Sequence, residues 1–293
     1  MLGDAVLDRE TVFSDAIDAI FESYRPFTQD EFDDTLRRWD KWVGHVVVYE
    51  GEIFVSKPFG GVARADMLPL IDAVSSFNRS LKVEFIINNE DWPKNSTPVP
   101  IFSFSRADST NDVPYPHRYV VPEEICDAGV TKVPFAARNN SVFGRFSLFC
   151  GSVNGRALPS TFLDYRKRCQ RAFFSDVKDA PVAWDVGPLG KTNHREPVHS
   201  PSITLSDVVD GKLVKKSIPS KPRVNMTSFG EHKYVLSTDG WVAGGKLSQL
   251  LATGSVVLKP QSMYRMYYEY FLSPNVHYVP LWQHGLHDYR CAS

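Results

Sequence analysis

The stretch KYVLSTDGWVAGGKLSQLLATGSVVLK, residues 233–259, decides the fold of this chain. Its pattern predicts a strand over 233–237, a glycine-rich loop over 238–245, a helix over 246–252 that ends at Gly254, and a second strand over 255–259. A strand, a helix and a second strand in this order form a βαβ unit, in which the two strands lie parallel. The stretch therefore predicts an α/β domain with a parallel sheet.

The loop of this unit has the composition of an anion site. Glycines such as Gly240 let the backbone approach a ligand closely, and Lys246 adds a positive charge where the helix begins. This combination fits a nucleotide diphosphate. It fits equally well a plain βαβ turn in which the glycines only permit close packing.

The same loop also matches the first part of a Walker A motif, through Gly240, Gly245 and Lys246. The next residue of that motif is Ser or Thr, which holds magnesium, and here it is Leu247. The following strand ends without the carboxylate of a Walker B strand. A P-loop NTPase is therefore not expected.

Towards the N-terminus, helices alternate with strands. Thr28 and Glu31 have the spacing of a capping box, which predicts where the second helix begins. The buried strand over 82–88 ends just before Asp91, and carboxyl ends of strands are where ligands bind in α/β sheets. Asp91 is therefore either a general base or a cap of the turn before Pro93. The other predicted elements are helices over 11–24, 28–42, 66–77 and 160–174, strands over 100–104 and 146–150, and hairpins over 46–55 and 203–218.

Composition excludes several classes of protein. Thirty-three basic and 34 acidic residues give a net charge of −1, without the basic surplus of a nucleic-acid-binding protein. The four cysteines show no CxxC spacing, and no Asp-x-Asp follows a strand, so a metal site is not expected. No apolar run approaches membrane-spanning length, so any membrane association is expected through a segment that this chain lacks. Sequons at Asn78, Asn95, Asn139 and Asn225 favour a secreted or lumenal chain.

Five segments together resemble glycosyltransferase family 90, which includes protein O-glucosyltransferases that act on EGF-like repeats, KDEL-motif proteins and capsule-associated xylosyltransferases. They occur in family order over about residues 45–281: VEFIINNEDWP (83–93), PIFSFSRADSTNDVPYP (100–116), FCGSVNGR (149–156), residues 233–259, and SPNVHYVPL (273–281). The resemblance implies a GT-B fold, in which two Rossmann-like domains hold the active site in the cleft between them. The expected domains are 1–135, which carries the catalytic aspartate, and 136–293, which binds the sugar nucleotide.

The resemblance also implies roles for individual residues. Asp91 matches the catalytic aspartate of an N-x-x-D-x-P motif, so it would deprotonate the acceptor hydroxyl in an inverting reaction that needs no metal or other cofactor. The implied donor-binding residues are Gly151, Ser152, Arg156, Asp239, Gly240, Lys246 and Ser255, and those on the acceptor side are Trp92, Phe104 and Asp112. The implied substrates are UDP-glucose or UDP-xylose and a protein or glycan hydroxyl, in the lumen of the endoplasmic reticulum or Golgi.

Three departures from the family pattern leave an alternative open. Cys150 stands where the family has an arginine beside the nucleotide, and Lys246 stands where it usually has another arginine. After Leu281 the family continues with a long helical region, so this chain is expected to be truncated there. The alternative is a relative of the same fold that binds carbohydrate or nucleotide with weakened catalysis.

Overall fold

A computed structural model describes most of the chain as two compact units. The described residues are 9–22, 24–39, 41–50, 52–56, 82–94, 98–108, 110–116, 133–147, 169–189, 202–209 and 212–283. The first unit comprises residues 1–118 and 264–272, and the second comprises 119–263 and 273–293. The two units divide at residue 118, and the short segment 264–272 belongs to the first; the domains 1–135 and 136–293 stay a prediction. The helix predicted over 66–77 lies outside the described residues.

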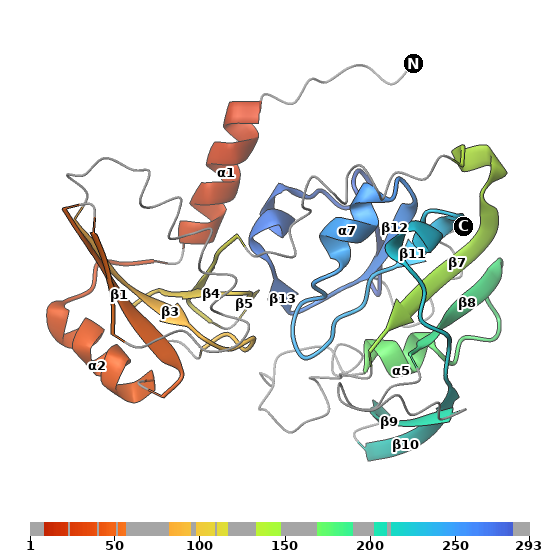
Figure 1. Cartoon of the computed structure of the whole chain (residues 1–293), viewed down its shortest axis with the longest axis horizontal. Coiled ribbons are helices and arrows are strands. Elements are labelled where there is room, and N and C mark those ends of the chain that lie inside the picture. The colour runs from red at the N-terminus through yellow and green to blue at the C-terminus, as the bar shows by residue number, and fades with distance from the viewer. Residues whose placement is uncertain are drawn as a thin grey trace. The chain divides into compact units, whose positions relative to one another are not determined.

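The second unit is built on a five-stranded parallel sheet (Figure 1), in the order β14-β12-β11-β7-β8. Its strands are β7 (Asn139–Phe146), β8 (Ala183–Pro188), β11 (His232–Leu236), β12 (Val256–Pro260) and β14 (Val279–Leu281). Helix α7 (Leu247–Ala252) connects the parallel strands β11 and β12, which confirms the predicted βαβ unit. Gly254, just after this helix, has a φ of 67°, the left-handed conformation that glycine adopts most easily.

The strand predicted over 146–150 is displaced towards the N-terminus. Strand β7 ends at Phe146, Ser147 lies outside it, and 148–150 lie outside the described residues. The strand was predicted there because the residues after Phe146 are largely apolar. The strand is instead placed by its pairing with β11 and β8, where Val142 lies opposite Tyr234 and Trp184. Strand β8 was not predicted, whereas the predicted hairpin is confirmed as β9 (Ser202–Val209) and β10 (Lys212–Pro219).

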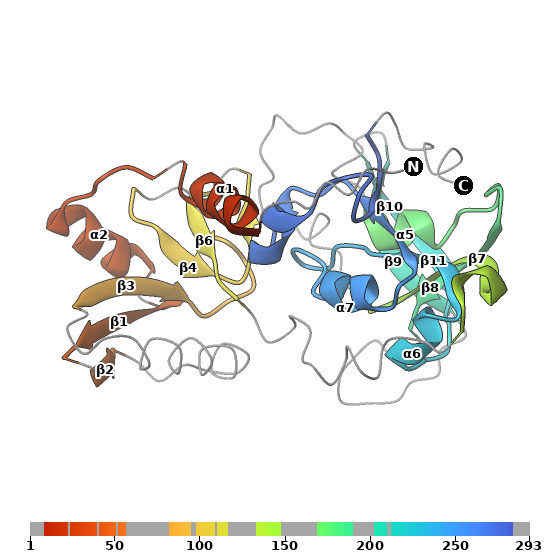
Figure 2. The same cartoon turned by 90° about the horizontal axis from the view of Figure 1, so that it is seen from above.

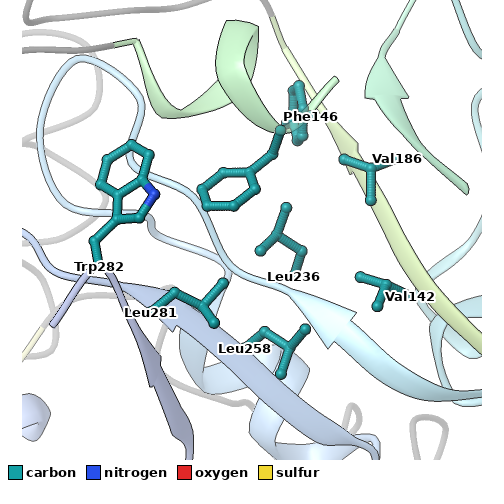
Figure 3. Packing of buried hydrophobic residues seen from close by; sticks show 8 residues of the cluster. Val142, Phe146, Val186, Leu236, Leu258, Leu281 and Trp282 are labelled. Atoms are coloured by element: carbon teal, nitrogen blue, oxygen red, sulfur yellow. The ribbon is translucent and has the colours of Figure 1, made fainter. Parts of the chain in front are cut away.

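One face of this sheet packs into the core of the second unit (Figure 3). The buried members of the core are Val142, Phe146, Phe174, Val186, Leu236, Leu258, Leu281 and Trp282. Trp282 is 0% exposed, and its ring stacks on that of Phe174 at 5.2 Å between centroids. Trp282 is therefore part of the core, where its large indole fills the space beside α5 (Gln170–Phe174).

The first unit has a mixed sheet rather than a mostly parallel one (Figure 2), in the order β2-β1-β3-β4-β6. Strand β1 runs antiparallel to both of its neighbours, and the remaining pairs are parallel. The strands are β1 (Val43–Tyr49), β2 (Glu52–Val55), β3 (Val83–Asn88), β4 (Ile101–Ser103) and β6 (Asp112–Pro114). The predicted hairpin and buried strand are thus confirmed.

Short elements complete the first unit. Helix α1 (Arg9–Phe21) is fastened by Arg106, which donates to the Ile20 carbonyl at 3.0 Å. Strand β5 (Arg106–Ala107) pairs with β13 (Tyr264–Arg265), and the 3-10 helix η4 (Tyr267–Phe271) follows β13. This pairing is why residues 264–272 belong to the first unit. The remaining elements are η1 (Phe135–Ala137) and α6 (Met226–Phe229), both in the second unit.

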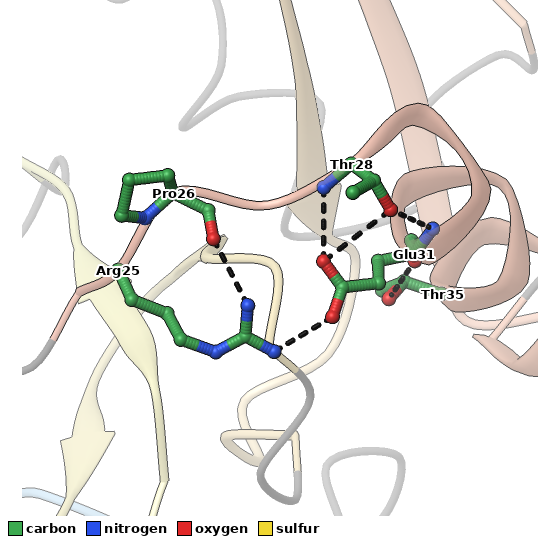
Figure 4. Close-up of polar contacts among 5 residues, drawn as sticks. All are labelled: Arg25, Pro26, Thr28, Glu31 and Thr35. Carbon is green, nitrogen blue, oxygen red and sulfur yellow. Dashed lines mark hydrogen bonds and ion pairs between the residues drawn. The ribbon is translucent and has the colours of Figure 1, made fainter.

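The predicted capping box is present at the start of α2 (Gln29–Trp39), as Figure 4 shows. The Thr28 backbone N–H donates to the Glu31 carboxylate at 2.9 Å, and the Glu31 N–H donates to the Thr28 hydroxyl at 3.3 Å. The Arg25 guanidinium also contacts this carboxylate, at 2.6 Å. Two backbone donors that the helix itself leaves unpaired are thereby satisfied.

We expect Thr28→Ala to lower the free energy of unfolding by about 1 kcal/mol, because the Glu31 N–H loses its acceptor at the helix start. Urea denaturation followed by circular dichroism measures the change. Thr28→Ser is the control, because serine keeps the hydroxyl that accepts from the Glu31 N–H. Equal stability of Thr28→Ala and the wild type would show that the box contributes nothing.

Candidate functional site

The carboxyl edge of the parallel sheet in the second unit is the first part of the candidate site. Within the sheet, β8 lies on one side of β7, whereas β11, β12 and β14 lie on its other side. The strand order therefore reverses between β7 and β11. In open α/β sheets, ligands bind outside the carboxyl ends of the strands at such a reversal. Ser147 follows β7 at this point, and the glycine-rich loop follows β11.

Gln170, the first residue of α5, connects the loops after β11 and β12. Its amide oxygen accepts from the Asp239 backbone N–H at 2.8 Å, and its amide nitrogen donates to the Asp239 carboxylate at 3.3 Å and to the Gln261 carbonyl at 3.2 Å. The Ser262 hydroxyl donates to the same Asp239 oxygen. Asp239 is therefore tied into the scaffold of the edge, which holds the loop that follows it.

Arg171, the next residue of α5, lies between the loops after β7 and β11. Its Nη1 donates to the Ser147 carbonyl at 2.8 Å and to the Ser147 hydroxyl at 3.1 Å. The residue is only 8% exposed, and burial lowers the pKa of its guanidinium to about 10, although Asp239 opposes this effect. A Cβ added at Gly240 would lie 2.8 Å from Arg171 Nη2. A side chain at this position would have to push the end of Arg171 aside, so the loop and the guanidinium are in close contact. The sequence analysis did not single out Arg171.

Lys246 reaches the same end of β7. Its ammonium group lies 3.4 Å from the Arg145 carbonyl oxygen and 5.6 Å from the centre of the Phe229 ring. The residue as a whole is exposed, but its ammonium end is partly desolvated. This desolvation and the charges of Arg171 and Arg223 lower the pKa of Lys246 to about 8. Lys246 makes no ion pair within the part of the chain that the structure describes.

Arg145, by contrast, has a compensated charge. Its guanidinium donates to the Asp185 carboxylate and to the Asp185 carbonyl, at 2.7 Å in each case, and Lys221 contacts the same carboxylate at 3.0 Å. Burial raises the pKa of Asp185, but hydrogen bonds from Arg145 and Lys221 outweigh this and hold it below its ordinary value. Among the described residues at this edge, Lys246 and Arg171 make no salt bridge to a carboxylate.

The glycine-rich loop is closely packed as well as cationic. A Cβ added at Gly244 would lie 2.7 Å from the Thr238 carbonyl oxygen. Because that oxygen belongs to the backbone, this position requires glycine. Helix α7 has only six residues, and its N-cap residue Lys246 makes no side-chain capping bond. The full positive charge beside the loop therefore comes from the Lys246 side chain, and so short a helix adds only a weak dipole.

Ser255 lies at the opposite edge of the sheet from the other donor-side residues. Its hydroxyl donates to the His232 carbonyl at 2.7 Å and accepts from Arg138 at 3.0 Å. Ser255 precedes β12 and His232 begins β11, so both lie at the amino ends of their strands. The structure thus brings Asp239, Gly240 and Lys246 to the carboxyl edge and leaves Ser255 on the other side.

Three expected donor residues, Gly151, Ser152 and Arg156, lie outside the described residues, as does Cys150. Cys169, which is described, is disulfide-bonded, and its sulfur accepts from the Ala172 N–H at 3.2 Å at the start of α5. This disulfide is therefore attached to the short helix that carries Gln170 and Arg171.

In the first unit, Asp91 is exposed on a loop whose neighbouring residues are firmly held. The buried Asn88 side chain accepts from the Glu90 N–H at 3.0 Å and donates to the Trp92 carbonyl, so it bridges the residues on both sides of Asp91. The Lys94 ammonium contacts the Glu90 carboxylate at 2.8 Å. These bonds hold the Asp91 backbone at the carboxyl end of β3. Asn88, the first residue of the N-x-x-D-x-P motif, is therefore a positioning residue, a role that the sequence analysis did not assign to it.

The three residues expected on the acceptor side are covered to different extents. Trp92 is partly buried and packs edge-on against Tyr264, with 6.2 Å between ring centroids. Phe104 is 7% exposed and Asp112 is 1% exposed. Phe104 and Asp112 therefore offer almost no surface to an acceptor in this structure.

Asp112 is bonded to Lys94, at the end of the loop that carries Asp91. Its carboxylate accepts from the Lys94 backbone N–H at 3.0 Å and from the Ser103 hydroxyl, whereas Oδ2 has no hydrogen-bond partner among the described residues. Burial raises the pKa of Asp112 from 3.8 to about 6, and the bonds from Ser103 and Lys94 oppose that shift. The Asp112 carboxyl therefore binds a proton more readily in the folded chain than in the unfolded chain.

This shift predicts a pH dependence of stability. Because its pKa is higher in the folded state, the contribution of Asp112 to stability is complete below about pH 4 and is lost as pH rises from 4 to 6. Asp112→Asn keeps an acceptor for Lys94 and removes the buried charge. We expect it to raise the free energy of unfolding at pH 7 by roughly 2–4 kcal/mol and to change it little at pH 4. Thermal unfolding at both pH values tests this, and an equal effect at both would contradict it.

Two further features of the described residues bear on the class of protein. None of the helices they form is both long and apolar enough to cross a membrane. Within the same residues, no three side chains of His, Cys, Asp or Glu are grouped as ligands for a metal ion.

Comparison with known proteins identifies the family. The model of glycosyl transferase family 90 matches residues 18–292. The chain is also 27% identical over 219 residues to protein O-glucosyltransferase 2 of Danio rerio, a match that covers 70% of this chain and 38% of that protein. The chain thus spans well under half the length of this relative. Because the family model covers nearly the whole chain, the chain belongs to glycosyltransferase family 90.

Proposed function

We propose that the chain is an inverting glycosyltransferase that moves glucose or xylose from a UDP-sugar to a hydroxyl of a protein serine or threonine, or of a glycan, without a metal ion. The second unit would bind the donor, and Asp91 of the first unit would act on the acceptor. The proposal includes the GT-B arrangement that the family resemblance implies.

The observation that carries this proposal is the ammonium group of Lys246 at the carboxyl end of β7. It makes no ion pair within the described residues, and the charges of its neighbours Arg171 and Arg223 repel it. Such a group is stabilised by a bound anion. The strand order of this sheet reverses beside it, which is where a nucleotide binds in Rossmann-like sheets.

The family resemblance supports the following chemistry. The Asp91 carboxylate takes the proton of the acceptor hydroxyl as that oxygen attacks the anomeric carbon from the face opposite the diphosphate. The bond between that carbon and the diphosphate oxygen breaks in the same displacement, so the anomeric configuration inverts. UDP leaves with the bonding electrons, and the charge of Lys246 stabilises it.

The acceptor and the compartment are proposed from three further observations. The relative's name specifies glucose transfer to protein, but the match covers only 38% of that protein. The disulfide of Cys169 is typical of an oxidising compartment. Two sequon asparagines, Asn139 and Asn225, are exposed, as a glycosylated lumenal chain requires. We therefore propose the lumen of the endoplasmic reticulum or Golgi.

A UDP-release assay tests the function. UDP-glucose and UDP-xylose are each incubated with the chain and a panel of EGF-like domains and glycans, with and without EDTA. We expect acceptor-dependent UDP release that EDTA does not change. Stabilisation by UDP without release from any donor would favour the non-catalytic relative instead. Neither stabilisation nor release would overturn both forms of the proposal.

A further inference from the structure

We infer that Arg171 binds the donor diphosphate beside Lys246 and supplies a second positive charge, in a chain that has Cys150 where the family has an arginine. This inference rests on the proposed function, because it assumes a UDP-sugar donor. It assigns a ligand-binding role to a residue in α5, which none of the family-like segments contains.

The first argument is convergence. Arg171 donates to the Ser147 carbonyl, and Lys246 donates to the Arg145 carbonyl. Both cations therefore contact the backbone at the carboxyl end of β7. They belong to different segments of the chain: Arg171 lies before β8, and Lys246 lies after β11. Two like charges brought together at a strand end repel each other, and an anion between them relieves the repulsion.

The second argument is that the guanidinium of Arg171 has unused hydrogen-bonding capacity. Its Nη1 is bonded to Ser147, but its Nε is buried and has no partner among the described residues. Asp239, the carboxylate that attracts it, already accepts hydrogen bonds from Gln170 and Ser262. A buried arginine with an unsatisfied donor is costly unless a ligand completes it, and its planar fork matches the geometry of phosphate.

The third argument is the glycine that faces Arg171. An added Cβ at Gly240 would lie 2.8 Å from Nη2, 3.3 Å from Cζ and 3.4 Å from Nη1, which is directly against the guanidinium. The loop backbone therefore packs directly on the guanidinium and helps to hold it beside Ser147, and a methyl group at this position would have to displace it.

The test compares the affinities for UDP and uridine, because only UDP carries the diphosphate. We expect Arg171→Met to weaken UDP binding by about 10- to 100-fold and to change uridine binding by less than about threefold. Arg138→Met is the matched control, since Arg138 is equally buried but lies at the amino edge of the same sheet, bonded to Ser255 and the Thr253 carbonyl. Its ratio of UDP to uridine affinity should equal that of the wild type. Isothermal titration measures the affinities, and circular dichroism checks the fold.

A second variant keeps the test decisive if Arg171→Met does not fold. Gly240→Ala retains the arginine but places a methyl group against it, and we expect the same selective loss for UDP. Equal weakening of UDP and uridine in the folded variants, or no weakening, would overturn the role of Arg171 and leave the proposed function standing. A wild-type chain that does not bind UDP would overturn both.

Discussion

Asp91→Asn is expected to lower turnover by a factor of about 10² to 10⁴ while UDP affinity stays within about twofold of the wild type. The amide has nearly the shape of the carboxylate, so the exposed loop keeps its backbone bonds to Asn88. What it loses is the capacity to accept a proton from the acceptor hydroxyl. Donor binding is expected to persist, because the residues proposed to hold UDP belong to the second unit.

The measurement is UDP release at saturating donor and acceptor, alongside titration of UDP. Asp34→Asn is the matched control, since Asp34 is an exposed aspartate of the same unit, on α2, with only an exposed contact to Arg37 at 3.5 Å. We expect the control to have wild-type turnover. If Asp91→Asn also keeps wild-type turnover, Asp91 is not the base, and the proposed mechanism fails while donor binding remains.

The predictions of the fold that succeeded rest on local signals. The capping box of Thr28 and Glu31 marked the start of α2 because both bonds form within four residues. The βαβ unit over 233–259 was predictable because its strands are apolar and Gly254 ends its helix. The limits of β7 were not predictable, because they depend on pairing with β8 and β11, the latter some 90 residues away in sequence.

The site was predictable only in part, for a similar reason. Asp239, Gly240 and Lys246 lie in one continuous segment, so their pattern could be recognised. The roles of Arg171 and Asn88 depend on contacts that a sequence does not show. Arg171 packs closely against Gly240, and Asn88 makes two hydrogen bonds to the backbone on either side of Asp91. Ser255 belongs to the same segment as Lys246, yet it lies at the other edge of the sheet, since a parallel βαβ unit returns to the amino edge before its second strand.

Lys246 is expected to make UDP binding depend on pH above neutrality. Its pKa in the free chain is lowered to about 8, first by desolvation and then by Arg171 and Arg223. A bound diphosphate raises this pKa, because it stabilises the ammonium form. The sign follows from that difference: affinity is complete below pH 8 and is lost as pH rises through 8, by up to about tenfold per pH unit.

Titration of UDP between pH 7 and pH 9 measures this dependence, and Lys246→Arg is the decisive variant. Arginine keeps its charge throughout that range, so we expect its affinity for UDP to change by less than about twofold, whereas that of the wild type falls by about tenfold. Arg171 stays charged up to about pH 10, so it contributes little to the slope. Lys246→Met should bind weakly at both values of pH, because it has no charge to lose. A wild-type affinity that does not change up to pH 9 would show that Lys246 does not contact the diphosphate, since a contact that depends on its charge cannot survive the loss of that charge.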